Sequence, residues 1–197
     1  MSPETSHLSE AELYLLDAVT RRIFPGDPTD PGAAEAGVVD YIRSVVDESR
    51  SGVLECYRTG LAELDRRAVA IHGVGFTDLK EAHQDAVLVA LESEVDELMA
   101  AETSTLVENS AAYFFGLVCE HTLHGMFSDP IHGGNRDGIG WRLIGFPGPR
   151  WGYSAADMAA GVDASTLPIT SLAEVESEAR ARWGETCPET SPKKMRD

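Results

Sequence analysis

The sequence has little positive charge. Its 197 residues include 16 lysines and arginines against 33 aspartates and glutamates, which gives a formal net charge of -17. Nucleic acids and anionic membranes attract proteins that present a basic face, and so acidic a chain offers little of one. The sequence also contains no apolar run that is long enough to span a bilayer. We therefore expect neither a nucleic-acid partner nor membrane insertion by this chain.

Targeting and disulfide signals are also missing. Residues 1–8 carry neither the basic segment nor the apolar segment of a secretory signal. The pair Arg21 and Arg22 is followed by Pro25, where a twin-arginine signal would have an apolar stretch. Three widely spaced cysteines give no disulfide framework and no Cys-x-x-Cys pair: Cys56, Cys119 and Cys187. We expect a cytoplasmic location, and a periplasmic one if the chain is exported with a partner or if a signal was trimmed.

The alternation of apolar and polar residues that marks strands is absent, whereas helical spacing is common. Ser9 and Glu12 form a capping box that begins a helix, which Pro25 ends. Ser171 and Glu174 form a second box, which begins an exposed helix over 172–183.

Four more helices are expected between these two. One begins at Asp30 and Pro31, with the aspartate as cap. The next follows the apolar stripe of 54–71 and ends near Gly73, and another is capped by Thr77 or Asp78. The last covers 110–127, ends near a capping Gly125 and is apolar on almost every side, which is typical of a central, buried helix.

Residues 127–148 read FSDPIHGGNRDGIGWRLIGFPG. Large apolar groups run through this glycine- and proline-rich stretch, which distinguishes it from a flexible linker and predicts an ordered loop. The fold is therefore expected to be mainly α: a small helical bundle with one long ordered Gly/Pro-rich loop. We predict a single helical domain over 8–183, including a structured loop at 127–153, with flexible termini at 1–7 and 184–197.

Several polar residues near the end of the central helix suggest two different roles. His121 and His124 share a helix face, and with His132 they could bind zinc or iron. The His-Glu-x-x-His pattern is absent, however, because Glu120 precedes the first histidine. The other interpretation is that Glu120 and His121 donate or accept hydrogen bonds with the backbone of the loop and fix its shape.

No motif for nucleotide binding or nucleophilic catalysis is present. The run Gly-Gly-Asn-Arg-Asp-Gly matches neither the phosphate-binding loop nor the dinucleotide fingerprint, and no strand precedes it. The oxygen-rich loop does not have the spacing of a calcium-binding EF-hand. Ser128 lacks a nucleophile-elbow setting. We expect no catalytic residue, metal site or cofactor site in this chain.

Several segments together carry a resemblance to a known family. They are residues 127–130, 133–138 and 140–148 in the loop, 22–25, 31–33 and 36–42 near the start, and, more weakly, 57–65. In this order they resemble the gluconate 2-dehydrogenase subunit 3 family over residues 8–153. The resemblance implies a non-catalytic small subunit that binds and stabilises a large FAD-dependent oxidoreductase of the glucose-methanol-choline type. That partner would hold the FAD and act on sugars or polyols.

The resemblance, with the enrichment of aromatic and arginine side chains at protein interfaces, also implies which residues meet the partner: Asp129, His132, Asn135, Arg136, Trp141, Phe146 and Trp151. Glu120 and His121 would support them. Two alternatives stay open. One is an autonomous metal-dependent enzyme that uses His121, His124 and His132. The other is a transient escort chaperone for a flavoprotein.

Overall fold

The computed structural model describes residues 7–49, 52–100 and 111–183, except for the side chains of 97–100 and 183. Every regular element in these ranges is helical, which confirms the mainly α fold. The order is α1 (Glu10–Ile23), α2 (Ala33–Ala36), α3 (Val38–Glu48), α4 (Val53–His72), η1 (Phe76–Asp78), α5 (Glu81–Ala100), α6 (Ala111–Phe127), η2 (Pro130–His132), η3 (Arg136–Gly138), α7 (Ile139–Leu143), η4 (Ala164–Thr166) and α8 (Leu172–Trp183). The predicted flexible termini lie, apart from residue 7, outside the described residues.

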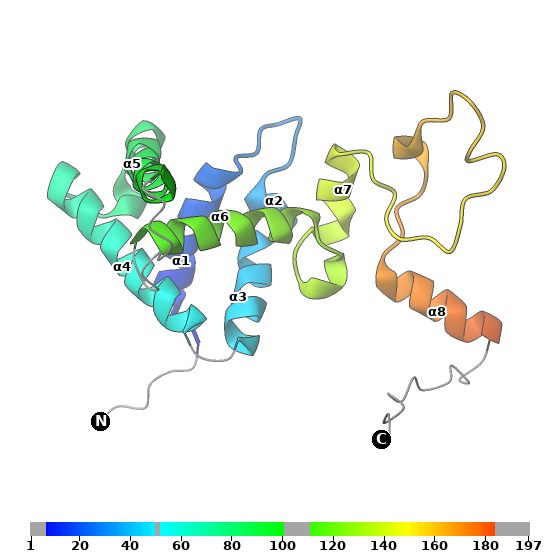
Figure 1. Cartoon of the computed structure of the whole chain (residues 1–197), viewed down its shortest axis with the longest axis horizontal. Coiled ribbons are helices and arrows are strands. Elements are labelled where there is room, and N and C mark those ends of the chain that lie inside the picture. Colours follow the sequence, from blue (N-terminus) through cyan, green and yellow to red (C-terminus); the bar gives the residue numbers. More distant parts are fainter. Residues whose placement is uncertain (1–6, 50–51, 101–110, 184–197) are drawn as a thin grey trace, which may run out of the picture.

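Helix α6 occupies the centre of the bundle, as its nearly continuous apolar sequence predicts. It runs across α1, α3, α4 and α5 and leads directly into the loop at its far end (Figure 1). Phe114 of α6 is buried against Gly60 of α4, where any side chain larger than hydrogen would collide with the ring. Leu16, Ile42 and Leu64 bring the core contributions of α1, α3 and α4. The core therefore lies around α6, and the loop begins where this core ends.

Both predicted capping boxes are present. The Ser9 backbone N–H donates to the Glu12 carboxylate, and the Glu12 N–H donates back to the Ser9 hydroxyl. Ser171 and Glu174 make the same exchange at the start of α8. The predicted end of α4 is also confirmed, since Gly73 follows the last helical residue with a φ of 80°.

Three predicted helix boundaries are wrong. Asp30 is not a cap: Asp27 accepts the Thr29 and Asp30 backbone N–H groups in a turn, and helix begins only after Gly32. Thr77 and Asp78 lie within the 3-10 turn η1, and α5 begins at Glu81.

The third wrong boundary is Gly125, which lies inside α6 rather than at its end. A Cβ there would come within 3.2 Å of Val38 in α3, so the glycine permits close helix packing. Local propensity cannot distinguish that use of glycine from a helix cap.

The predicted loop contains more regular structure than its composition suggests, because η2, η3 and the short helix α7 all lie within it. Beyond α7 the chain leaves the bundle, makes an excursion and returns to α8, all to one side of the other helices (Figure 1). We call residues 150–183 the C-terminal arm. None of the residues 151–182 is buried. Across the described ranges, no helix combines the length and the apolar character needed to cross a membrane.

Candidate partner-binding surface

Asn135 holds the beginning of the loop together. Its side chain is fully buried, and its φ of 45° lies in the left-handed region that asparagine tolerates better than most residues. The side-chain amide donates to the Ser128 carbonyl at 2.8 Å, and the side-chain oxygen accepts the Gly140 N–H at 2.8 Å. The Asn135 N–H donates to the Gly125 carbonyl in α6. One side chain thus joins the end of α6 to the start of α7.

Trp141 is the second internal anchor of the loop. Its indole N–H donates to the Phe127 carbonyl at 2.6 Å, and its ring packs edge-on against Phe146 with centroids 5.2 Å apart. Only 3% of its surface is exposed. The preceding Gly140 has no room for a side chain, because a Cβ would collide with the Met126 carbonyl. The α6–α7 junction therefore has a tightly defined shape.

These contacts correct the expectation that Asn135 and Trp141 face a partner. Both side chains are covered by their own chain, because the loop must satisfy its own buried backbone groups and bury its largest ring. The sequence did contain a signal for Asn135: asparagine beside glycine in a turn-rich run is the residue best suited to a left-handed position.

Asp129 and Arg136 lie at the surface and bind other parts of the chain. The Asp129 carboxylate accepts the Ile131 N–H at 3.1 Å and the Leu172 N–H at 2.7 Å, so it links the loop to the start of α8. Arg136 donates to the Asp40 carboxylate of α3 at 3.1 Å. These two residues orient the loop and the arm, whatever else they contact.

His132, Phe146 and Trp151 are exposed, as an interface role requires. Phe146 and Trp151 belong to a larger group, because nine of the fifteen exposed large apolar side chains in the described structure lie between residues 131 and 172. We call these nine the apolar face: Ile131, Leu143, Ile144, Phe146, Trp151, Tyr153, Met158, Val162 and Leu172. Exposed apolar groups that gather in one patch mark binding surfaces, whereas single scattered ones do not.

Charge does not separate the arm from the rest of the chain. Residues 150–183 contain three basic and five acidic side chains among 34 residues, and residues 1–149 contain 10 basic and 25 acidic side chains among 149. The exposed apolar groups of the arm, rather than a lack of charged residues, therefore distinguish it.

The predicted support of the loop by Glu120 and His121 is wrong. His121 Nδ1 is hydrogen-bonded to the Tyr57 hydroxyl of α4 at 2.8 Å, and the two rings stack. Burial lowers the pKa of His121, and burial raises that of Tyr57 well above its usual value. Glu120 is exposed and makes no hydrogen bond within the described structure. His121 therefore joins α6 to α4, and Asn135 and Trp141 support the loop instead.

The three histidines proposed as metal ligands are not brought together. The ring centroids of His121 and His124 are 6.4 Å apart, with His121 engaged by Tyr57. His132 instead lines a groove beside Tyr41 and Ser44 of α3. In the described ranges, no three His, Cys, Asp or Glu side chains are grouped closely enough to hold a metal ion. The geometry thus gives no support to a metal-dependent enzyme using these residues.

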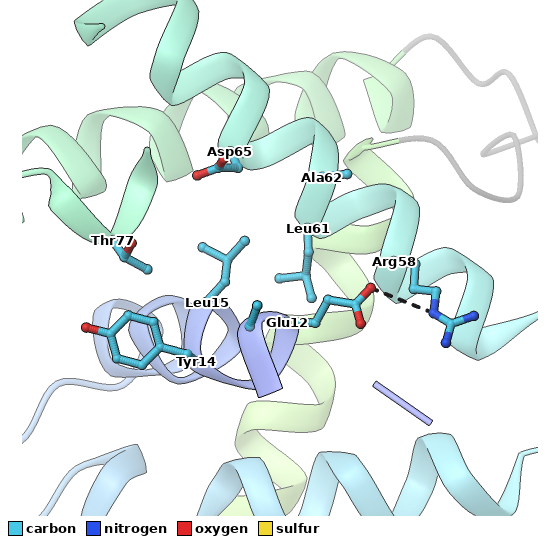
Figure 2. A pocket seen from close by; sticks show the side chains of 9 residues that line it. Glu12, Tyr14, Leu15, Arg58, Leu61, Ala62, Asp65 and Thr77 are labelled. Carbon is cyan, nitrogen blue, oxygen red and sulfur yellow. Dashed lines mark ion pairs between the residues drawn. The ribbon is translucent and has the colours of Figure 1, made fainter. Parts of the chain in front are cut away.

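A pocket of about 350 Å³ lies between α1 and α4. Leu15 and Leu61 lie in this pocket, while Glu12 of α1 faces Arg58 of α4 across it as an ion pair of 3.7 Å (Figure 2). Asp65 points toward the far end, where it accepts the Phe76 N–H at 2.8 Å. The charged groups of this pocket are therefore engaged in holding α1, α4 and η1 together.

A family model described as gluconate 2-dehydrogenase subunit 3 matches residues 10–148 of the chain. No curated protein and no solved structure matches it. The matched region covers the bundle and the loop through α7 and stops just before the arm.

Proposed function

Because the chain belongs to the gluconate 2-dehydrogenase subunit 3 family, we propose that it is the non-catalytic small subunit of a dehydrogenase complex. Its partner in this proposal is a large FAD-dependent oxidoreductase of the glucose-methanol-choline type that oxidises a sugar or a polyol. FAD in that partner supplies the redox chemistry. This chain supplies a shaped surface that stabilises the large subunit.

The apolar face carries the proposal. Burying a large apolar side chain stabilises an association by about 1.5–3 kcal/mol, and aromatic residues are enriched at binding hot spots. Trp151 is 61% exposed, Met158 68% and Phe146 41%. A few such side chains, buried together in a cleft of the partner, offset the cost of association and of ordering the arm.

The rigid α6–α7 junction supports the same proposal. Asn135, Trp141 and Gly140 fix the position from which Phe146 and Trp151 project. A surface that is already ordered loses less conformational entropy on binding, which increases affinity. The arm itself is fixed at both of its roots, since Thr170 donates to the Pro147 and Pro149 carbonyls and Asp129 accepts the Leu172 N–H.

We place FAD in the partner rather than in this chain. Dinucleotide pyrophosphates are typically held by a glycine-rich turn between a strand and a helix. The described ranges contain no strand, and the glycine-rich run of the loop leads from one 3-10 turn into another. The surface that this chain offers suits contact with a protein.

Co-expression tests the proposal. The neighbouring gene is expected to encode the large flavoprotein, and the two chains should elute together from size-exclusion chromatography. Replacing Phe146, Trp151 and Met158 by serine should reduce recovery of the complex at least about tenfold, because hot-spot residues dominate affinity. The matched control replaces Val69, Ile71 and Val89, which are equally bare on the bundle, and should leave recovery unchanged.

Two results would contradict the proposal. One is a flavoprotein that is folded and fully active without this chain. The other is a flavoprotein that needs the chain during expression yet never elutes with it, which is the behaviour of a transient escort chaperone.

A further inference from the structure

A groove of about 430 Å³ lies between α3 and the turn η2. Its lining from α3 occupies one helix face at spacings of three and four residues: Tyr41, Ser44, Val45 and Glu48. The opposite side consists of Ser128, Ile131, His132 and Gly133. The two sides are close, since a Cβ on Gly133 would come within 3.6 Å of the Ser44 hydroxyl oxygen.

Several polar groups of this groove have no partner. Within the part of the chain that the structure describes, the Tyr41 hydroxyl, the Glu48 carboxylate and the His132 imidazole make no hydrogen bond or ion pair. The Ser128 hydroxyl oxygen is buried and equally unpartnered. A buried hydroxyl without a partner costs stability. This groove therefore differs from the pocket between α1 and α4, whose charged groups are engaged.

Glu48 also stands out among the carboxylates of its own helix. Asp40 binds Arg43 and Arg136, both at 3.1 Å, and Asp47 binds His7 at 2.7 Å. Glu48 has no such partner in the described ranges. The groove consequently combines one uncompensated negative charge with oxygen and nitrogen atoms that can accept hydrogen bonds.

We propose that this groove binds the guanidinium group of an arginine side chain, which, if the proposed function holds, the large partner subunit supplies. Guanidinium has five donors and no acceptor, so it suits a groove whose lining includes the Glu48 carboxylate, the Tyr41 phenol and the His132 imidazole. Its planar face can also lie on the half-buried Tyr41 ring. The net charge of -17 attracts such a cation at long range.

The position of the groove supports a partner as the source of the arginine. Ile131, a member of the apolar face, lines the groove and is 52% exposed. A protein that contacts Ile131 therefore reaches the edge of the groove. An apolar face with a charged, hydrogen-bonding pocket at its edge has the usual anatomy of a specific protein interface.

The test uses the full-length chain, labelled with ¹⁵N and observed by NMR. N-acetyl-arginine-N-methylamide is titrated into it, with the citrulline analogue as a neutral isostere and the lysine analogue as a cation of different shape. The arginine probe should shift the amides of residues 41–48 and 131–133 in a saturable manner. Citrulline should bind at least about tenfold more weakly, and lysine several-fold more weakly, because it offers fewer, undirected donors.

Two variants with the same change of charge separate the groove from general attraction. Glu48→Gln should weaken the arginine probe at least about fivefold. Glu178→Gln, on the exposed surface of α8, should leave binding unchanged. Equal binding of citrulline, equal binding to Glu48→Gln, or shifts spread over the whole surface would each overturn the inference. Both positions are exposed, and unchanged spectra elsewhere would verify that the variants fold.

A second measurement distinguishes failure of this inference from failure of the proposed function. In the complex with the large subunit, Glu48→Arg should weaken association at least about tenfold, because a like charge then occupies the groove. If the arginine probe binds but no complex with a flavoprotein exists, the proposed function is wrong and the chemistry of the groove stands. The opposite result is a complex that forms with the same affinity when Glu48→Arg is introduced, together with a chain that does not bind the arginine probe. In that case the inference is wrong and the proposed function stands.

Discussion

The bundle and the C-terminal arm handle burial in opposite ways. The bundle encloses most of its large apolar side chains around α6, although six of them, including Val69, Ile71 and Val89, are exposed. The arm encloses none of its side chains from residue 150 through residue 182. A helix of 12 residues such as α8 is marginal in water without a packed face. This difference supports the proposal that the arm, unlike the bundle, completes its packing against another chain.

The largest loss of stability is expected from a substitution of Gly140, for which Gly152 on the arm is the control. Gly140→Ala forces the α6–α7 junction apart, because the new Cβ collides with the Met126 carbonyl. We expect a loss of about 3 kcal/mol or more, which lowers the melting temperature by about 6–12 °C. Gly152→Ala, at the start of the arm, meets nothing within 4 Å and should change melting by less than about 1 °C. Thermal unfolding followed by circular dichroism compares the two, and equal effects would show that the junction is not tightly packed.

Loss of the Asn135 side chain should have the next largest effect. Asn135→Ala leaves the buried Gly140 N–H without a partner and also removes the bond to the Ser128 carbonyl. We expect the free energy of unfolding to fall by about 2–4 kcal/mol in chemical denaturation. Arg136→Ala, next along the chain, removes a solvent-exposed ion pair and should cost less than about 1 kcal/mol. If Arg136→Ala lowered the free energy of unfolding more than Asn135→Ala does, Asn135 would not be the internal anchor of the loop.

On the arm, a substitution is expected to weaken binding to the partner and to leave folding nearly unchanged. Trp151→Ala should weaken association with the large subunit by about ten- to a hundredfold, as hot-spot tryptophans do. The isolated chain should melt within about 2 °C of wild type, since Trp151 is 61% exposed. Surface plasmon resonance with the purified large subunit measures the first quantity. Unchanged affinity, or collapse of the isolated chain, would place Trp151 outside the interface.

The smallest expected effect is a dependence of the stability of the bundle on pH. Burial lowers the pKa of His121 below its usual value of about 6.5, so near that pH the unfolded chain binds more protons than the folded chain. Stability should therefore decrease as the pH falls through about 6.5, with a slope below about 1.4 kcal/mol per pH unit for one proton. His121→Gln should flatten this dependence in denaturation curves recorded between pH 5 and 7. An unchanged slope would mean that His121 does not cause it.

Local patterns predicted much of this fold because capping and periodicity are local effects. The boxes at Ser9 and Ser171, and the stop at Gly73, all depend on residues within four positions. The site was harder to predict because its decisive contacts are distant in sequence. His121 binds Tyr57 across 64 positions, and no pattern near α6 indicates that.

The same reason explains the misplaced interface residues. Tryptophan and asparagine in a glycine-rich loop fit an interface and an internal anchor equally well. Asn135 contacts Ser128 and Gly140, and Trp141 contacts Phe127. Both residues are therefore internal anchors of the loop. Phe146 and Trp151 are exposed, at 41% and 61%, as an interface role requires.

Hydrogen–deuterium exchange of the isolated chain and of its complex with the large flavoprotein tests the central claim most directly. We predict that complex formation slows exchange across residues 143–172 and leaves the outer surface of α4 around Val69 and Ile71 unaffected. Protection confined to α4, with the arm exchanging as fast as in the free chain, would contradict the claim that the apolar face is covered by a partner.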